Sequence, residues 1–84
     1  MNSKKPSRGN QSTIDFVRMG AIIKQARKNA GITQEQLAID CERSYEFIRR
    51  LESTEAKEGI SLDLLYKISV VLETRIDKFF EVEK

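Results

Sequence analysis

The side chains best suited to chemistry gather in one short stretch, residues 43–52. Three arginines stand there with a tyrosine and a glutamate: Arg43, Tyr45, Glu46, Arg49 and Arg50. Arginine donates hydrogen bonds in a rigid fork that matches carboxylate and phosphate groups. Phe47, Ile48 and Leu51 follow helical spacing between them, which predicts a helix with an apolar inner face and a polar, arginine-bearing outer face.

Bond-breaking chemistry is not indicated. The chain has no histidine and a single cysteine, Cys41. Histidine metal sites and histidine general bases are therefore excluded, and a serine or cysteine nucleophile would lack its usual partner. One cysteine cannot form an intrachain disulfide, and its place on an apolar helix face predicts a core residue. We expect no enzyme, no metal, no cofactor and no small-molecule ligand.

Charge and hydropathy limit which binding partners and which cellular compartment we expect. Residues 1–31 carry seven basic groups and one acidic group, whereas residues 32–84 carry eight basic and twelve acidic groups. This asymmetry permits a polyanionic partner, with the N-terminal third as a contributor. No stretch approaches the roughly 18–20 apolar residues that span a bilayer, and no apolar run follows the basic N-terminus. We expect a cytoplasmic protein without a membrane partner.

The elements that position the arginine-bearing helix are predicted to be helices as well. The first helix begins near Thr13 and ends at Gly31, because apolar residues recur at helical spacing and glycine supplies a left-handed stop. The second begins at Thr33, which forms a capping-box pattern with Gln36. Ser44 caps the third helix after a tight turn.

Two further helices complete the prediction. The fourth runs from its cap, Ser61, to about Leu72, and the fifth is short, from about Arg75 to Val82. No segment of useful length alternates with strand period. We therefore predict an all-α fold with five helices, in which residues 13–84 form one domain and residues 1–12 form a disordered basic arm.

The pair of helices around the turn resembles a known family. The chain is similar to the Cro/CI-type (XRE-like) phage-repressor family of helix-turn-helix regulators over about residues 19–80. The resemblance rests on Gly31-Ile32-Thr33-Gln34-Glu35-Gln36-Leu37-Ala38, Ser44, Ile48-Arg49-Arg50-Leu51-Glu52, Ser61-Leu62, Ile68, Leu72 and Ile76-Asp77-Lys78-Phe79-Phe80. It implies a five-helix lambda-repressor-like domain that binds double-stranded DNA and regulates transcription, with the third helix in the major groove.

The resemblance also implies roles for individual residues. The expected base contacts are Ser44, Tyr45, Glu46 and Arg49. The expected contacts to the DNA backbone are Gln34, Arg43, Arg50 and Lys57. Arginine can bond guanine in a bidentate fork, and glutamate can accept from cytosine. Arg27 and Glu52 match a structural ion pair that ties the first helix to the third.

The N-terminal arm allows two interpretations. Lys4, Lys5 and Arg8 belong either to a solubilising tail or to an arm that lies along DNA or enters its minor groove. The loop after the third helix contains Glu55 and Glu58 beside Lys57, which weakens the family's usual grip on the DNA backbone there. The arm could take over this role.

The sequence also departs from the family at its turns. Glu42 and Glu73 stand where glycine is usual, and Arg43 replaces an apolar turn residue. A left-handed non-glycine residue costs roughly 1–2 kcal/mol, so either these turns differ here or the chain accepts that cost. Arg43 either lays its stem along apolar surface or contacts a phosphate.

The resemblance implies a homodimeric repressor that reads a palindromic operator, because a single small module contacts few bases. Candidate interface residues are Phe79, Phe80 and Val82, with closure of the monomer core as the other reading. Antitoxins and restriction–modification controllers of the same fold remain alternatives, and a partner protein remains open. A further alternative is a protein-interaction module that keeps the helix-turn-helix without binding DNA.

Overall fold

The computed structural model describes residues 14–54 and 59–81. Within these ranges it contains four α-helices and one 3₁₀ helix, and no strand. The elements are α1 (Phe16–Asn29), α2 (Gln34–Cys41), α3 (Tyr45–Leu51), α4 (Leu62–Val71) and η2 (Ile76–Phe80). The all-helical prediction is confirmed, but the five-helix count holds only if η2 is included. The basic arm, Lys57 and Val82 lie outside the described residues.

The predicted start of the first helix is two to three residues too early. Its cap is Asp15, whose carboxylate accepts a hydrogen bond at 3.0 Å from the backbone N–H of Arg18. Aspartate is among the strongest capping residues. The backbone is therefore still extended at Asp15, where the first helical turn was predicted, and the helix begins at Phe16. The other end agrees with the prediction, since Gly31 adopts a left-handed φ of 75°.

Three serine or threonine caps start the remaining α-helices. Thr33 accepts from the N–H of Gln36, Ser44 from that of Phe47, and Ser61 from that of Leu64. The capping box at α2 is only half made, because the Gln36 amide donates to Asp40 one turn later instead of returning to Thr33. Each cap satisfies a backbone donor that the helix itself leaves without a partner.

The predicted fifth helix is a five-residue 3₁₀ helix. No side chain caps its start at Arg75, and the segment is short, so packing rather than helix propensity must hold it. Phe79 supplies that packing, with 1% of its surface exposed. This burial overturns the proposal of Phe79 as an interface residue, because its ring already closes the monomer core. Phe80 remains 44% exposed.

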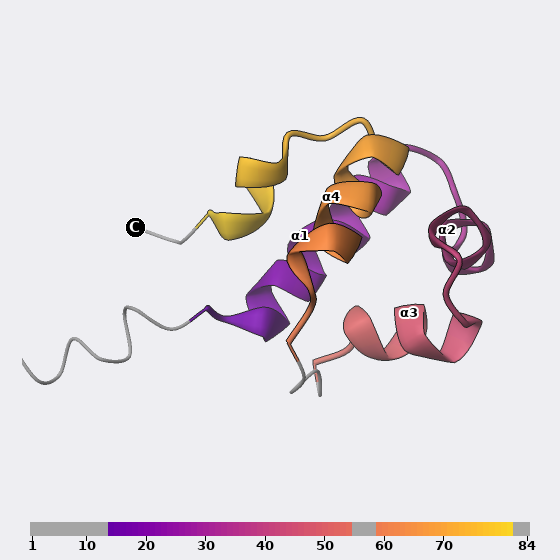
Figure 1. Ribbon diagram of the computed structural model, residues 1–84, viewed down its shortest axis with the longest axis horizontal. Coiled ribbons are helices and arrows are strands. Elements are labelled where there is room, and N and C mark those ends of the chain that lie inside the picture. Colours follow the sequence, from indigo (N-terminus) through magenta and orange to yellow (C-terminus); the bar gives the residue numbers. More distant parts are fainter. Residues whose placement is uncertain (1–13, 55–58, 82–84) are drawn as a thin grey trace, which may run out of the picture.

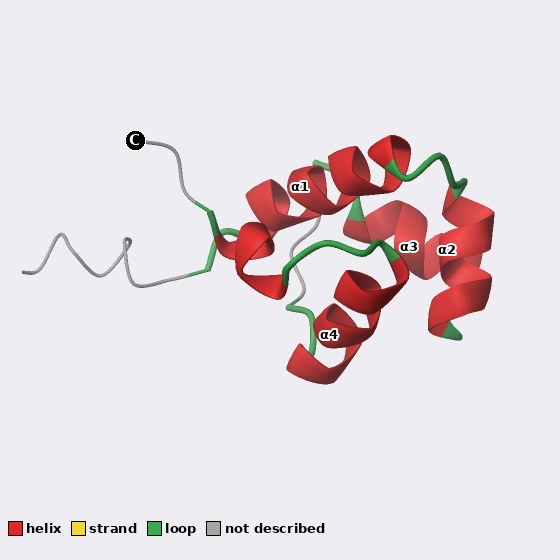
Figure 2. Cartoon of the chain, turned by 90° about the horizontal axis from the view of Figure 1, so that it is seen from above, coloured by secondary structure: helices red, strands yellow, loops and turns green. Residues whose placement is uncertain are grey.

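One apolar core joins all the elements. It is built from residues that are buried on the inner faces of the helices: Met19, Ile23, Leu37, Ala38, Cys41, Ile48, Leu51, Leu64, Leu65, Ile68, Leu72 and Phe79. In Figure 1 and Figure 2, α2 and η2 lie at opposite ends of this arrangement, with α1 and α4 between them. Cys41 is fully buried as predicted, and the loss of solvation raises the pKa of its thiol.

A glycine sets the distance between α1 and α3. Gly20 is buried in the first half of α1, and a Cβ atom there would overlap the carbonyl oxygen of Leu51, the last residue of α3. The two backbones can approach this closely only because glycine has no side chain. No role for Gly20 was predicted from the sequence, although a glycine inside a predicted helix is a signal of such a contact.

Candidate nucleic-acid interface

The turn between α2 and α3 is short and is closed by two backbone hydrogen bonds. Glu42 follows α2 with a left-handed φ of 60°, and its N–H donates to the carbonyl of Ile39 at 3.1 Å. The N–H of Arg43 donates to the carbonyl of Ala38 at 2.9 Å. This pattern is a helix-ending motif that usually contains glycine. The turn keeps the geometry expected of a glycine position, so the chain accepts the strain at Glu42.

The outer face of α3 carries the residues expected to touch bases. Ser44, Tyr45, Glu46 and Arg49 are all exposed, whereas Ile48 on the opposite face is fully buried. Tyr45 and Arg49 are four residues apart and therefore share one side of the helix. The structure thus brings the four side chains onto one accessible surface, which we call the α3 outer face.

An ion pair joins two members of the α3 outer face. Arg49 Nη2 donates to Glu46 Oε1 at 2.7 Å, and both side chains are more than half exposed. The hydrogen bond that Arg49 donates to Glu46 raises the pKa of the Arg49 guanidinium, which stays charged. Pairs this exposed contribute little to folding stability. The main effect of the contact is to orient the Arg49 fork and offset its charge in the free protein.

Arg43 and Arg50 flank the half-buried ring of Phe47. Their guanidinium carbons lie 5.9 Å and 6.0 Å from the ring centroid. Cation–π contact at this distance adds attraction and lays the arginine stems over apolar surface. The Arg43 guanidinium therefore lies near the Phe47 ring while the residue as a whole is exposed, and its contact to a phosphate stays a prediction.

A buried ion pair fixes the far end of α3. Arg27 Nε donates to Glu52 Oε2 at 2.8 Å and Arg27 Nη2 donates to Glu52 Oε1 at 3.0 Å, which makes a bidentate contact. Arg27 Nη1 also donates to the carbonyl of Ile32 at 2.8 Å. The two charged side chains are 9% and 1% exposed. These are the positions at which the family resemblance places a structural pair.

Gln34 belongs to the same network. Its side-chain Nε2 donates to Glu52 Oε1 at 2.9 Å, so the start of α2 is bonded to the C-cap residue of α3. The sequence predicted a contact from Gln34 to the DNA backbone but not this bond to Glu52. The amide nitrogen carries two donors, and the bond to Glu52 uses one of them while holding the side chain in a defined direction.

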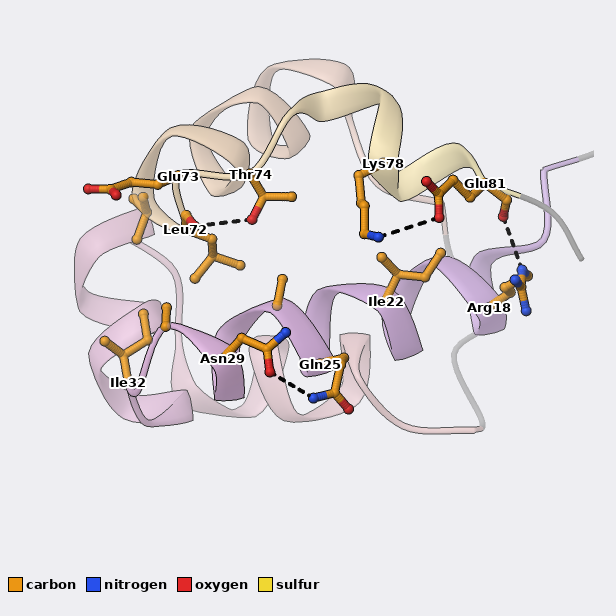
Figure 3. A pocket seen from close by; sticks show the side chains of 13 residues that line it. Arg18, Ile22, Gln25, Asn29, Ile32, Leu72, Glu73, Thr74, Lys78 and Glu81 are labelled. Carbon is orange, nitrogen blue, oxygen red and sulfur yellow. Dashed lines mark hydrogen bonds and ion pairs between the residues drawn. The ribbon is translucent and has the colours of Figure 1, made fainter.

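A groove on another side of the molecule contains none of the expected DNA contacts. It has a volume of about 670 Å³ and runs between α1 and the segment from the end of α4 through η2, as Figure 3 shows. Arg18 Nε donates to the carbonyl of Glu81 at 3.0 Å, and Lys78 pairs with the Glu81 carboxylate at 3.6 Å. These basic groups are therefore held by acceptors within the groove.

Two other features are missing from the part of the chain that the structure describes. None of its helices is long and apolar enough to cross a bilayer. Residues 14–54 and 59–81 bring together no group of three potential metal-ligating cysteine or acidic side chains. The α3 outer face and its supporting network are the arrangement best suited to recognition.

Comparison with known proteins identifies the fold. The chain is similar to the crystal structure of the restriction-modification controller protein C.AhdI from Aeromonas hydrophila. The TM-score is 0.70 at 22% sequence identity, over 81% of this chain and 100% of that chain. No protein-family model and no curated protein sequence matches. The chain therefore shares the small helix-turn-helix fold of this neighbour.

Proposed function

We propose that this protein is a sequence-specific DNA-binding transcriptional regulator that acts as a homodimeric repressor. The observation that carries the proposal is the α3 outer face, where Ser44, Tyr45, Glu46 and Arg49 are exposed together on a helix fixed at both ends. The Ser44 cap fixes its start, and the Arg27–Glu52 pair fixes its end. A rigid helix with exposed hydrogen-bonding groups is suited to reading base edges in the major groove.

The neighbouring groups supply contacts to phosphates. Arg43 and Arg50 flank the α3 outer face and present guanidinium groups beside Phe47. The second amide donor of Gln34 lies at the start of α2, where the backbone N–H groups of a helix favour an anion. Lys57 and the arm residues Lys4, Lys5 and Arg8 add positive charge in the proposal, from segments outside the described residues.

The structural neighbour favours one form of regulator. C.AhdI is a restriction-modification controller protein, so a controller of that kind is the first alternative to a simple repressor. The Glu46–Arg49 pair favours a second alternative, a protein-interaction module, because it offsets charge on the face that would meet DNA.

Selection from a pool of random duplexes separates the two kinds of function. A DNA reader should enrich a palindromic sequence, with half-sites about one helical turn apart, and its affinity should fall steeply with salt concentration. An interaction module should enrich no sequence. If no sequence is enriched and the protein binds no duplex at low salt, the proposal is contradicted. A regulated gene is then sought by matching the enriched sequence to promoters.

A further inference from the structure

The ion pair on the α3 outer face presents a fixed pattern of hydrogen-bond donors and acceptors. Arg49 Nη2 donates to Glu46 Oε1 at 2.7 Å, and residues three apart on a helix are surface neighbours. Both side chains are more than half exposed, so the contact adds little to folding stability. The pair is therefore accessible to a molecule outside the chain, and its hydrogen-bonding pattern limits what that molecule is.

Each member of the pair keeps hydrogen-bonding capacity after the contact is made. The Arg49 guanidinium carries five N–H groups, and the bond to Glu46 uses one of them. The Glu46 carboxylate can accept at both oxygens, and this bond occupies only part of the capacity of Oε1. The pair thus offers a row of donors from Arg49 that ends beside an acceptor from Glu46.

One base pair has the complementary pattern in the major groove. A G·C pair presents two acceptors, guanine N7 and O6, followed by one donor, the N4 amino group of cytosine. Guanine O6 and cytosine N4 are joined by a hydrogen bond within the base pair, so they lie about 2.9 Å apart. Arg49 Nη2 and Glu46 Oε1 are 2.7 Å apart. The two side chains can therefore meet the edge of one G·C pair without separating from each other.

Other partners fit the ion pair poorly. An A·T pair presents an acceptor, a donor and an acceptor, from adenine N7, adenine N6 and thymine O4. In the same position, the Arg49 donors would meet the N6 donor, and the Glu46 carboxylate would meet the O4 acceptor. Both contacts leave polar groups without partners, which costs affinity. A phosphate is also disfavoured, because Glu46 would meet it with like charge.

The helix holds the ion pair in a defined place. Ser44 caps the start of α3 by accepting from the Phe47 N–H at 3.0 Å, and Ile48, beside Arg49 in the sequence, is fully buried. These contacts fix the backbone that carries both charged residues. Two long side chains that already hold each other also lose less conformational freedom when they bind. The pair is thus prepared for its target before DNA arrives.

We propose that Glu46 and Arg49 read one G·C base pair of each half-site as a single unit. Arg49 donates to guanine N7 and O6, and Glu46 accepts from N4 of the cytosine paired with that guanine. This assignment rests on the proposed function and deepens it, because it names the base pair that the α3 outer face requires. Glu46 is then a specificity-determining residue and not only a charge that offsets Arg49.

The first test asks whether the two residues control the same position of the DNA site. Selection from random duplexes compares the wild type with Arg49→Ala and with Glu46→Ala, after circular dichroism has confirmed that each variant is folded. Both variants should lose preference at one shared position, which is G·C in the wild-type site. Changing that base pair to A·T should weaken wild-type binding about ten- to a hundredfold.

A second exposed ion pair supplies matched controls for this selection. Arg75 and Asp77 pair at 3.1 Å, and both lie away from α3. Arg75→Ala and Asp77→Ala remove the same charges from the chain as the two test variants. They should select the same sequence as the wild type, because the proposed unit is intact in both.

The second test changes single atoms of the DNA at the shared position. 7-Deazaguanine lacks the N7 acceptor, and it should weaken binding of the wild type and Glu46→Ala about three- to tenfold but leave Arg49→Ala unchanged. N4-Methylcytosine keeps its one remaining N4–H in the base pair, so it should weaken the wild type but leave Glu46→Ala unchanged. Inosine lacks only the minor-groove amino group of guanine and should affect all three proteins equally.

The outcomes separate this inference from the proposed function. A wild type that enriches no sequence contradicts both. If Arg49→Ala and Glu46→Ala lose preference at two different positions, or at a shared position that is not G·C, the single unit is overturned and DNA recognition stands. The same conclusion follows if either variant keeps the wild-type preference while its affinity falls equally for all duplexes, as expected of phosphate contacts. Modified bases that weaken the variants as much as the wild type would also overturn it.

Discussion

At the scale of single residues, the Glu46–Arg49 pair determines what the α3 outer face can do. The 2.7 Å contact engages Nη2 of the Arg49 guanidinium. The direction of the other N–H groups of the guanidinium is set by the place of Arg49 on the helix. In the free protein, Glu46 offsets the positive charge that would otherwise attract any phosphate. On a duplex, Arg49 can bond guanine, and Glu46 can accept from a neighbouring cytosine. A weaker attraction to phosphates suits either a sequence-specific DNA reader or the protein-interaction module, so the pair alone does not separate the two proposals.

Replacing Arg49 tests this role. We expect Arg49→Ala to relax base preference at one position in each half-site and to lower affinity about ten- to a hundredfold. The measurement is a selection from random duplexes followed by titration of the enriched sequence. Arg75→Ala is the matched control, because Arg75 is also exposed and paired with an acid, Asp77, away from α3. An unchanged sequence preference in Arg49→Ala would count against the assignment.

Removing Glu52 tests the supporting network. Glu52→Ala leaves the Arg27 charge buried without its partner, and we expect unfolding free energy to fall by about 3–5 kcal/mol. Urea denaturation measures the loss. The double variant Arg27→Met, Glu52→Leu removes both charges and should recover most of the stability. If the double variant is no more stable than Glu52→Ala, the stranded charge is not the cause.

At the scale of elements, strained turns and a close backbone contact set the angle of α3. Glu42 and Glu73 stand where the family usually has glycine, and both adopt left-handed conformations, with φ of 60° and 53°. Strain and a different turn could not be told apart from the sequence, because local sequence does not report the packing that holds a turn. The role of Gly20 could not be predicted either, because it depends on contact with α3, 31 residues later.

Relieving the strain at Glu73 should stabilise the fold. We expect Glu73→Gly to raise unfolding free energy by about 1 kcal/mol, since glycine adopts a left-handed conformation without steric cost. Glu42→Gly should gain less, because Glu42 also pairs with Lys67 at 3.5 Å. Chemical denaturation measures both. A destabilised Glu73→Gly would show that its left-handed backbone carries no strain.

Filling the contact at Gly20 should displace α3. We expect Gly20→Ala to lower unfolding free energy by about 1–3 kcal/mol, because the new methyl group overlaps a backbone carbonyl that cannot move alone. Gly59→Ala is the control, since its Cβ would meet only the end of the Phe16 ring, at 3.3 Å. Thermal melting reports both changes. Equal stability of Gly20→Ala and the wild type would contradict the close approach.

At the scale of the whole molecule, the sequence predicted the helical class and the four exposed residues that form the α3 outer face. Helical periodicity and capping residues are local signals, so Thr33, Ser44 and Ser61 were found as caps. Contacts between distant residues were harder to predict. The bond from Gln34 to Glu52, the burial of Phe79 and the exposure of Leu62 all depend on how the helices pack.

The most direct test of the account follows backbone amide signals by NMR while DNA is added. With a duplex enriched from the random pool, we predict that the signals that move most come from residues 43–50 and from the start of α2 at Gln34. The groove between α1 and η2 should stay unperturbed, and added salt should reverse the changes. Changes centred on that groove, or no changes at low salt, would contradict the claim that the α3 outer face reads DNA.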